Sequence, residues 1–157
     1  MLVATVLSVV ILASYGGYAA WNTINDDDGP GGLPAGNGFV ASSQRAAFAG
    51  RIAIGLGVNL RILKDVYQFR DDVNRTIDAV RAERANLQRR STGASGVRAD
   101  IVRSSIEATD RLEAGIIQWR DAIFSLRLGN AAPAESAIES AIAQLEANVA
   151  RWNSERG

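Results

Sequence analysis

The chain opens with a long run of apolar positions that carries no charged side chain before residue 22. Residues 2–21, LVATVLSVVILASYGGYAAW, would span about 30 Å as a helix, which matches the hydrocarbon thickness of a bilayer. Tyr15, Tyr18 and Trp21 stand at the C-terminal end of this run, where aromatic rings favour the headgroup boundary. The pattern predicts a single transmembrane anchor over residues 1–24.

Two other interpretations of this segment stay open, a cleaved signal peptide and a buried or virion-internal helix. Signal peptides usually begin with basic residues, and none precedes the apolar run, although Ala19 and Ala20 could form a cleavage site. Orientation is weakly determined, because the first basic side chain is that of Arg45. We expect the N-terminus inside and the rest of the chain on the extracytoplasmic side.

Small residues recur four positions apart within the predicted anchor. Ala13 and Gly17 form one such pair, and this spacing lets a second transmembrane helix approach closely. We therefore expect Ala13 and Gly17 to contact a partner helix in the membrane. The alternative is that small residues are simply abundant in this span.

A linker follows over residues 25–40. Residues 25–38 read NDDDGPGGLPAGNG, and glycine and proline at this density favour an extended, solvated tether over a helix. The three aspartates lack the fixed ligand offsets and the distal glutamate of a calcium-binding loop. We expect an acidic, solvated neck rather than a metal site.

From Ala41 onward the apolar positions follow the steps of three and four that place side chains on one face of a helix. Ser42 or Ser43 could cap the first helix, and no proline interrupts the chain before Pro133. One helix could therefore run from about 42 to 90, with a bend in its glycine-containing first third. Its two apolar stripes are Leu56, Leu60, Leu63 and Tyr67, and Val66, Phe69, Val73, Ile77, Val80 and Leu87.

Two shorter helices are predicted after the turn STGASG at 91–96. The second spans about 97–128, and the third begins near Pro133, which suits a first helical turn. The inner face of the second helix is Ile101, Ser105, Ala108, Leu112, Ile116, Trp119, Ile123 and Leu126, and that of the third is Ile138, Ile142, Leu145, Val149 and Trp152. Residues 41–157 are thus predicted to form an all-α antiparallel three-helix bundle, or coiled-coil-like hairpins, with a long first helix.

A helix from 42 to 90 would be about 70 Å long and would outrun the two helices packed against it. The stripe formed by Ile52, Leu56, Leu60 and Leu63 would then lie uncovered. We expect a partner protein, a second copy of the chain or the membrane surface to cover it.

The composition of the chain excludes several classes of binding and catalytic site. The 17 basic and 17 acidic residues give zero formal net charge, which argues against general binding of nucleic acid. The chain has no cysteine and no histidine, so disulfides, thiol nucleophiles and the commonest metal ligand are excluded. The Gly55-Leu56-Gly57 stretch lacks a nucleotide-binding fingerprint and suggests close helix packing instead. We expect no enzyme activity, no cofactor and no small-molecule substrate.

These observations favour a membrane-anchored structural or accessory subunit of a larger membrane protein assembly. A sensory or ligand-binding helical ectodomain is the first alternative. The layout of an anchor followed by helices also resembles, in shape alone and without a shared motif, phage inner-membrane spanins and bacterial membrane-anchored coiled-coil subunits. That resemblance implies a further alternative, a phage-type virion or spanin-like protein that interacts with membranes.

Overall fold

The chain folds into helices throughout the part that the computed structural model describes, residues 38–63 and 66–155. The elements are α2 (Phe39–Leu63), α3 (Val66–Ser91), α4 (Gly96–Phe124), the short 3-10 helix η1 (Leu128–Asn130) and α5 (Ala131–Ser154). No strand occurs within these described ranges, so the predicted all-α class is confirmed there.

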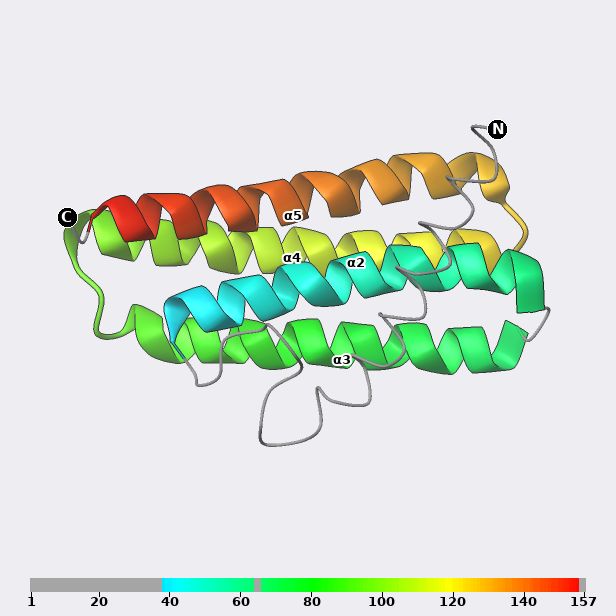
Figure 1. The fold of residues 1–157 in the computed structure, drawn as a ribbon, viewed down its shortest axis with the longest axis horizontal. Coiled ribbons are helices and arrows are strands. Elements are labelled where there is room, and N and C mark those ends of the chain that lie inside the picture. The colour runs from blue at the N-terminus through cyan, green and yellow to red at the C-terminus, as the bar shows by residue number, and fades with distance from the viewer. Residues whose placement is uncertain (1–37, 64–65, 156–157) are drawn as a thin grey trace, which may run out of the picture.

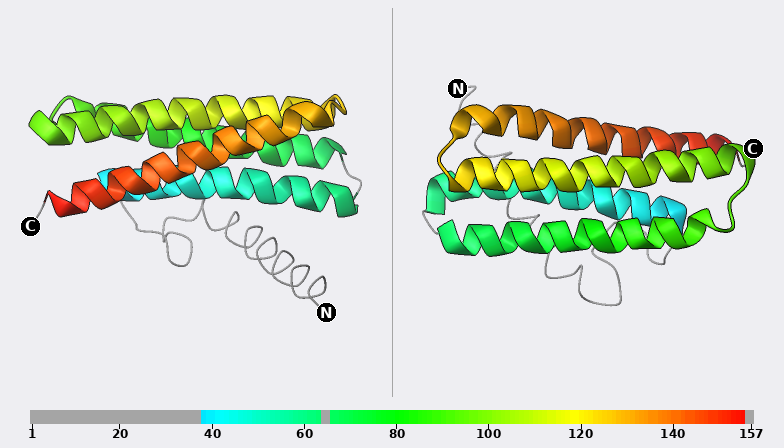
Figure 2. Two further views of the ribbon diagram at one scale, coloured as in Figure 1. Left: turned by 90° about the horizontal axis from the view of Figure 1, so that it is seen from above. Right: turned by 180° about the vertical axis from the view of Figure 1, so that it is seen from behind.

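The four long helices lie side by side and alternate in direction along the chain (Figures 1 and 2). Helix α2 packs against α3 and α5, and α4 packs against the same two helices on the other side. Because the helices contain 24 to 29 residues, each is about 36–44 Å long. The architecture is an antiparallel four-helix bundle with short connections.

The prediction of three helices is wrong, because the segment expected to form one long helix forms two. Helix α2 ends at Leu63, and α3 begins at Val66 and runs back alongside α2. A single long helix would have exposed the apolar positions of its first half, whereas the fold-back buries Ala46 and Phe69 in one core. The chain changes direction after the glycine-containing part of α2, where a bend was predicted. The four helices have similar lengths, so none extends far beyond its neighbours.

Helix α2 approaches its neighbours closely through small side chains. A Cβ atom added at Gly50 would lie 2.8 Å from Leu112 Cδ1 and 3.1 Å from Ile142 Cδ1. Gly55, in contrast, has nothing within 4 Å of such an atom, so the predicted close packing is at Gly50 and not at Gly55. The buried alanines of α2 are Ala41, Ala46, Ala47, Ala49 and Ala53.

The core has a large and a small hydrophobic cluster. The large cluster draws on all four helices and includes Leu112 and Trp119, whose ring meets Phe69 edge-on at 5.6 Å. The small cluster consists of Phe39, Leu87, Ile101, Val102 and Val149. Trp152 is half-buried beside the small cluster and stacks on Phe39 at a centroid distance of 4.3 Å. The tryptophans on the predicted inner faces therefore pack with the core.

A layer of polar side chains separates the two clusters. Along α4, Ser105 lies between Val102 of the small cluster and Ala108 of the large one. On α5, Asn148 lies next to Val149, and its Nδ2 atom donates to Ser105 Oγ at 2.9 Å and to Ser104 Oγ at 3.1 Å. These buried hydrogen bonds fix α4 and α5 at one level relative to each other.

The same layer continues across α2 and α3. Ser42 and Ser43 are buried, and their hydroxyl oxygens have no partner among the described residues. They do not cap α2, because the helix begins at Phe39 and the Ser42 N–H already donates to Gly38 O at 2.9 Å. At the edge of the layer, Arg45 Nε and Nη2 donate to the two carboxylate oxygens of Glu83 at 2.6 and 2.9 Å.

The helices of the bundle begin and end at turns with identifiable sequence features. Gly96, at the start of α4, has φ of +57°, a left-handed conformation that favours glycine. Helix α4 ends at Phe124, so Leu126, predicted on its inner face, lies in the following turn instead. Pro133 occupies the first turn of α5, as predicted.

Candidate functional site

The predicted partner-binding stripe is partly taken up by the bundle itself. Ile52 is buried, at 8% exposure, and Leu56 is half-buried against the large cluster. The expectation that they lie uncovered rested on the overhanging helix, which the fold-back removes. The side chains of Leu60 and Leu63 lie outside the described part of the structure, so their contact with a partner stays a prediction.

The predicted membrane segment also lies outside the described residues, together with Ala13, Gly17 and most of the linker at 25–40. Among the helices that the structure does describe, none is long and apolar enough to cross a bilayer. Within residues 38–63 and 66–155, no three acidic side chains converge in the manner of a metal site.

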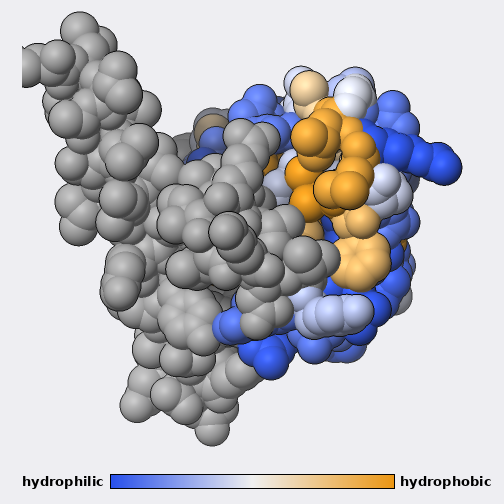
Figure 3. Space-filling view, turned by 90° about the vertical axis from the view of Figure 1, so that its right-hand side faces the viewer, coloured by the Kyte–Doolittle hydropathy of each residue, from blue (hydrophilic) through white to orange (hydrophobic). Residues whose placement is uncertain are grey.

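One end of the bundle is unusually apolar, and we call it the apolar end. The end of α2, the start of α3 and the turn after α4 lie there, and Figure 3 shows hydrophobic side chains gathered next to hydrophilic ones. Its exposed large apolar side chains in the described part are Tyr67, Phe124, Leu126 and Leu128. Four such side chains, from the start of α3, the end of α4 and the turn that follows α4, form more apolar surface than scattered single exposures do.

Leu126 stands out within the apolar end. It is the one non-glycine residue with positive φ in the described chain, at 57°, and its side chain is 82% exposed. Leu126 occupies the C′ position of a Schellman motif that ends α4, because its N–H donates to Ile123 O at 3.2 Å and the Arg127 N–H donates to Ala122 O at 2.9 Å. Glycine is the usual residue at this position, and a leucine there costs about 1–2 kcal/mol. Beside it, the Arg70 guanidinium lies 5.6 Å from the centre of the Phe124 ring and 5.8 Å from that of Tyr67.

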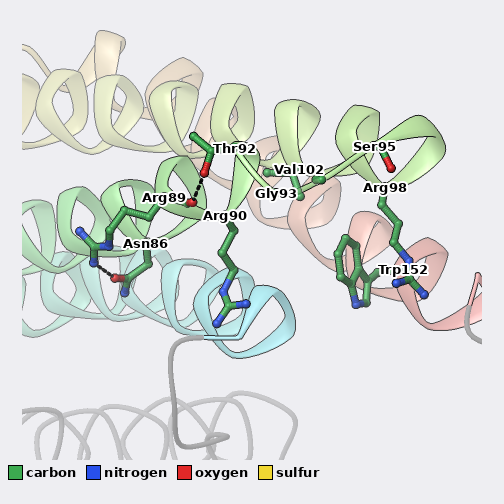
Figure 4. Close-up of a pocket in the computed structure, with 10 residues that line it drawn as sticks. Asn86, Arg89, Arg90, Thr92, Gly93, Ser95, Arg98, Val102 and Trp152 are labelled. Atoms are coloured by element: carbon green, nitrogen blue, oxygen red, sulfur yellow. Dashed lines mark hydrogen bonds between the residues drawn. The ribbon is translucent and has the colours of Figure 1, made fainter.

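The opposite end carries a pocket of about 580 Å³, which we call the basic pocket (Figure 4). It lies where α3, the turn to α4 and the C-terminal part of α5 meet. Arg89, Arg90 and Arg98 line it together with Thr92, Ser95 and Trp152. No carboxylate side chain is among the residues lining it. The pocket therefore presents hydrogen-bond donors and positive charge.

Two of these arginines are held by uncharged partners. Arg89 donates through Nη2 to Asn86 Oδ1. Arg98 lies 5.2 Å from the centre of the Trp152 ring and donates to the backbone oxygen of Glu155 at 3.4 Å. Neither Arg89 nor Arg98 makes an ion pair with the described residues, so both keep their full charge towards solvent.

A third group of charges, between α3 and α4, is structural. Arg81 Nε donates to Glu113 at 2.7 Å, and Arg84 bridges Asp110 and the same Glu113 at 2.6 and 3.0 Å. The hydrogen bond that Arg81 donates to Glu113, followed by the charge of that carboxylate, raises the pKa of Arg81. A raised arginine pKa contributes stability at pH values below the unfolded pKa, so Arg81 stays charged at physiological pH.

Sequence reasoning missed both ends. The signal for the basic pocket was available, because Arg89, Arg90 and Arg98 flank a turn that brings two helix ends together. The signal for the apolar end was the series of apolar residues at 124, 126 and 128, close to Gly129. It was masked because Leu126 also fits the helical stripe of α4.

Comparisons with protein-family models, with curated proteins and with solved structures each find no match for this chain. Any statement about function therefore depends on the sequence and on the geometry of the two ends.

Proposed function

We propose that this protein is a non-catalytic structural or accessory subunit of a membrane protein assembly. In this proposal the N-terminal segment anchors the chain and the helical bundle stands on the extracytoplasmic side. The apolar end of the bundle contacts a neighbouring protein subunit. The observation that carries the proposal is the group of exposed apolar side chains at that end, with Leu126 held in a left-handed turn.

Energetics support a covered apolar end. Burying a large apolar side chain contributes about 1.5–3 kcal/mol relative to leaving it in water. At position 126 an asparagine or glycine would satisfy the turn without strain, so the exposed leucine is unfavourable for the isolated bundle. A partner that buries Leu126 and Leu128 offsets both the strain and the exposure.

The position of the apolar end also suits such a role. Helix α2 begins at Phe39, which belongs to the small cluster at the same end as the basic pocket. In this proposal the chain enters the bundle from the anchor at that end, opposite the apolar end. The apolar end then lies about 36–44 Å further along the bundle. A bundle tethered in this way presents its apolar end away from its own attachment point.

The proposal is tested on the full chain in its native membranes. A double substitution, Leu126→Asn with Leu128→Ser, removes apolar surface while asparagine remains compatible with the left-handed turn. We expect co-purification of the partner after gentle solubilisation, followed by native mass spectrometry, to fall at least tenfold. The matched control is Val97→Ser, which removes an exposed apolar side chain from the opposite end and should leave the complex intact.

Each outcome has a meaning. Loss of a homodimer in the double variant would identify a second copy as the partner. Unchanged complexes in both variants, with both proteins folded by circular dichroism, would contradict the role of the apolar end. N-terminal sequencing that begins near residue 20 would separately contradict the anchor.

A second candidate function is a sensory or ligand-binding helical ectodomain. The specific observation in its favour is the basic pocket, which has the volume and the donors to hold a small anion. No comparable feature favours the spanin-like alternative, which stays a prediction from the overall layout.

A further inference from the structure

The basic pocket combines several donors around one opening in the surface. Three arginines and Ser95 line about 580 Å³, and no carboxylate side chain is among the lining residues. The Thr92 hydroxyl also lines the pocket but already donates to Arg89 O at 2.9 Å. In Figure 4 the side chains of Arg90 and Arg98 extend to the same side of the turn that joins α3 to α4. Guanidinium groups present paired N–H donors that match the oxygens of phosphate or carboxylate groups.

The beginning of α4 adds to the positive potential. Ser95 is the N-cap residue, but its side chain makes no capping hydrogen bond, and the first turn of α4 contains no acidic residue. The first backbone N–H groups of a helix lack partners within the helix and carry the positive end of its dipole. An anion in the pocket would therefore meet backbone donors as well as guanidinium groups.

Trp152 gives this site a fixed wall. Its ring is stacked on Phe39 on one side of the small cluster and lies 5.2 Å from the Arg98 guanidinium. The indole Nε1 atom is buried and has no acceptor among the described residues. An arginine held against a packed aromatic ring loses less rotamer freedom on binding, which favours recognition of a fixed ligand.

We propose that the basic pocket binds a phosphate-bearing anion, with Arg98 as the principal ligand and Arg89, which is held on Asn86, adding positive charge at the edge of the pocket. Two sources share this chemistry, a soluble phosphate or phosphate ester and the headgroup of an anionic phospholipid. The pocket lies at the end where α2 begins, and 17 residues separate Phe39 from Trp21 of the predicted anchor. A flexible linker of that length, as the sequence predicts, would have a root-mean-square span of about 23 Å and would bring a lipid headgroup within reach. The lipid source rests on the proposed function, whereas phosphate binding itself does not.

The experiment uses the full chain in nanodiscs of neutral phosphatidylcholine, titrated with inorganic phosphate at constant ionic strength. Hydrogen exchange of the backbone amides at 95–98 is the local readout. We expect phosphate to slow exchange there and Arg89→Gln with Arg98→Gln to weaken the apparent affinity at least tenfold. The matched control, Arg75→Gln with Arg103→Gln, removes the same charge from two exposed ion pairs elsewhere and should bind like the parent.

A second arm replaces part of the neutral lipid by phosphatidylglycerol without added phosphate. Slower exchange at 95–98 that depends on Arg89 and Arg98 assigns the headgroup as a ligand, and no change assigns a soluble phosphate. Loss of protection in the control variant as well, or no protection by either anion in the folded parent, overturns the proposal. Arg98→Lys is a second probe, since it keeps the charge but loses the paired donors, and we expect it to fall between the parent and the double variant.

Neither arm requires a partner protein. Failure of the apolar end to hold a partner would leave the phosphate titration unaffected. Failure of the titration would likewise leave the co-purification result unaffected, so the two proposals can be lost separately.

Discussion

The two ends of the bundle differ both in their surface and in the core beneath it. The apolar end stands on the large cluster, which reaches Phe69, Trp119 and Ile123 near that end. The basic pocket stands on the small cluster of five buried residues and shares Val102 with it. A deep core makes a rigid platform for a protein partner, whereas a shallow core leaves an end that a bound ligand can stabilise.

The largest expected effect on the free energy of unfolding comes from truncating one leucine in each cluster. Leu112 and Leu87 are both fully buried, but Leu112 lies against Gly50 where the backbones are already close. We expect Leu112→Ala to cost about 4 kcal/mol and Leu87→Ala about 2–3 kcal/mol, because the smaller cluster can relax around its cavity. Denaturant unfolding followed by circular dichroism measures both. An equal or reversed order would show that the two clusters do not differ in this way.

The polar layer between the clusters gives the next effect. Asn148→Ala removes the amide that bonds both Ser104 and Ser105, and it leaves a buried hydroxyl without its partner. We expect a loss of about 2 kcal/mol in the free energy of unfolding. Asn153→Ala, an exposed position on the same helix, is the control and should change stability by less than about 0.5 kcal/mol.

A smaller effect is expected from the ion pair at the edge of this layer. The Arg45 and Glu83 side chains are 18% and 13% exposed and form two hydrogen bonds between α2 and α3. A double-mutant cycle with Arg45→Gln and Glu83→Gln should give a coupling energy of about 1–2 kcal/mol. The cycle isolates the pair from the other contacts that either side chain makes.

The exposed pair Arg103–Asp100 is the control for that cycle, with side chains 70% and 67% exposed. Its coupling should lie below about 0.5 kcal/mol, because water screens the charges and both side chains lose rotamer freedom. Similar coupling energies for the two pairs would mean that the polar layer adds nothing to an ordinary surface ion pair.

Local periodicity predicted the helices well but not their number. The stripes placed Val73, Ile77 and Val80 on the inner face of one helix, and all three are buried. The change of direction between α2 and α3 was not predicted, because the helical periodicity of the sequence continues from one helix into the next with no glycine or proline between them. Whether the segment forms one long helix or two shorter ones depends on how much apolar surface it buries against helices that are distant in the sequence. The pattern of apolar positions within the segment does not contain this information.

The charges show the same limit. A spacing of four along one helix would pair Asp71 with Arg75. In the structure Arg75 pairs with Asp72, and Arg81 and Arg84 pair with carboxylates on α4. An arginine side chain is long enough to reach several acidic residues. The neighbouring helix determines which acidic residue an arginine pairs with. For the same reason, the residues that line the basic pocket could be identified only from the positions of the helix ends in the structure.

The smallest expected effect concerns Leu126 and separates stability from binding at the apolar end. Leu126 occupies a left-handed turn with its side chain 82% exposed, so it contributes strain to the isolated bundle and little burial. Asparagine tolerates this conformation better, and Leu126→Asn should therefore raise the free energy of unfolding by about 0.5–1 kcal/mol. Leu126→Ala, which keeps the strain and loses the exposed apolar surface, should leave stability nearly unchanged. Thermal unfolding of both variants by circular dichroism makes the comparison. If Leu126→Asn instead destabilises the bundle, the leucine packs on its own chain. That result would remove the main evidence that the apolar end binds a partner.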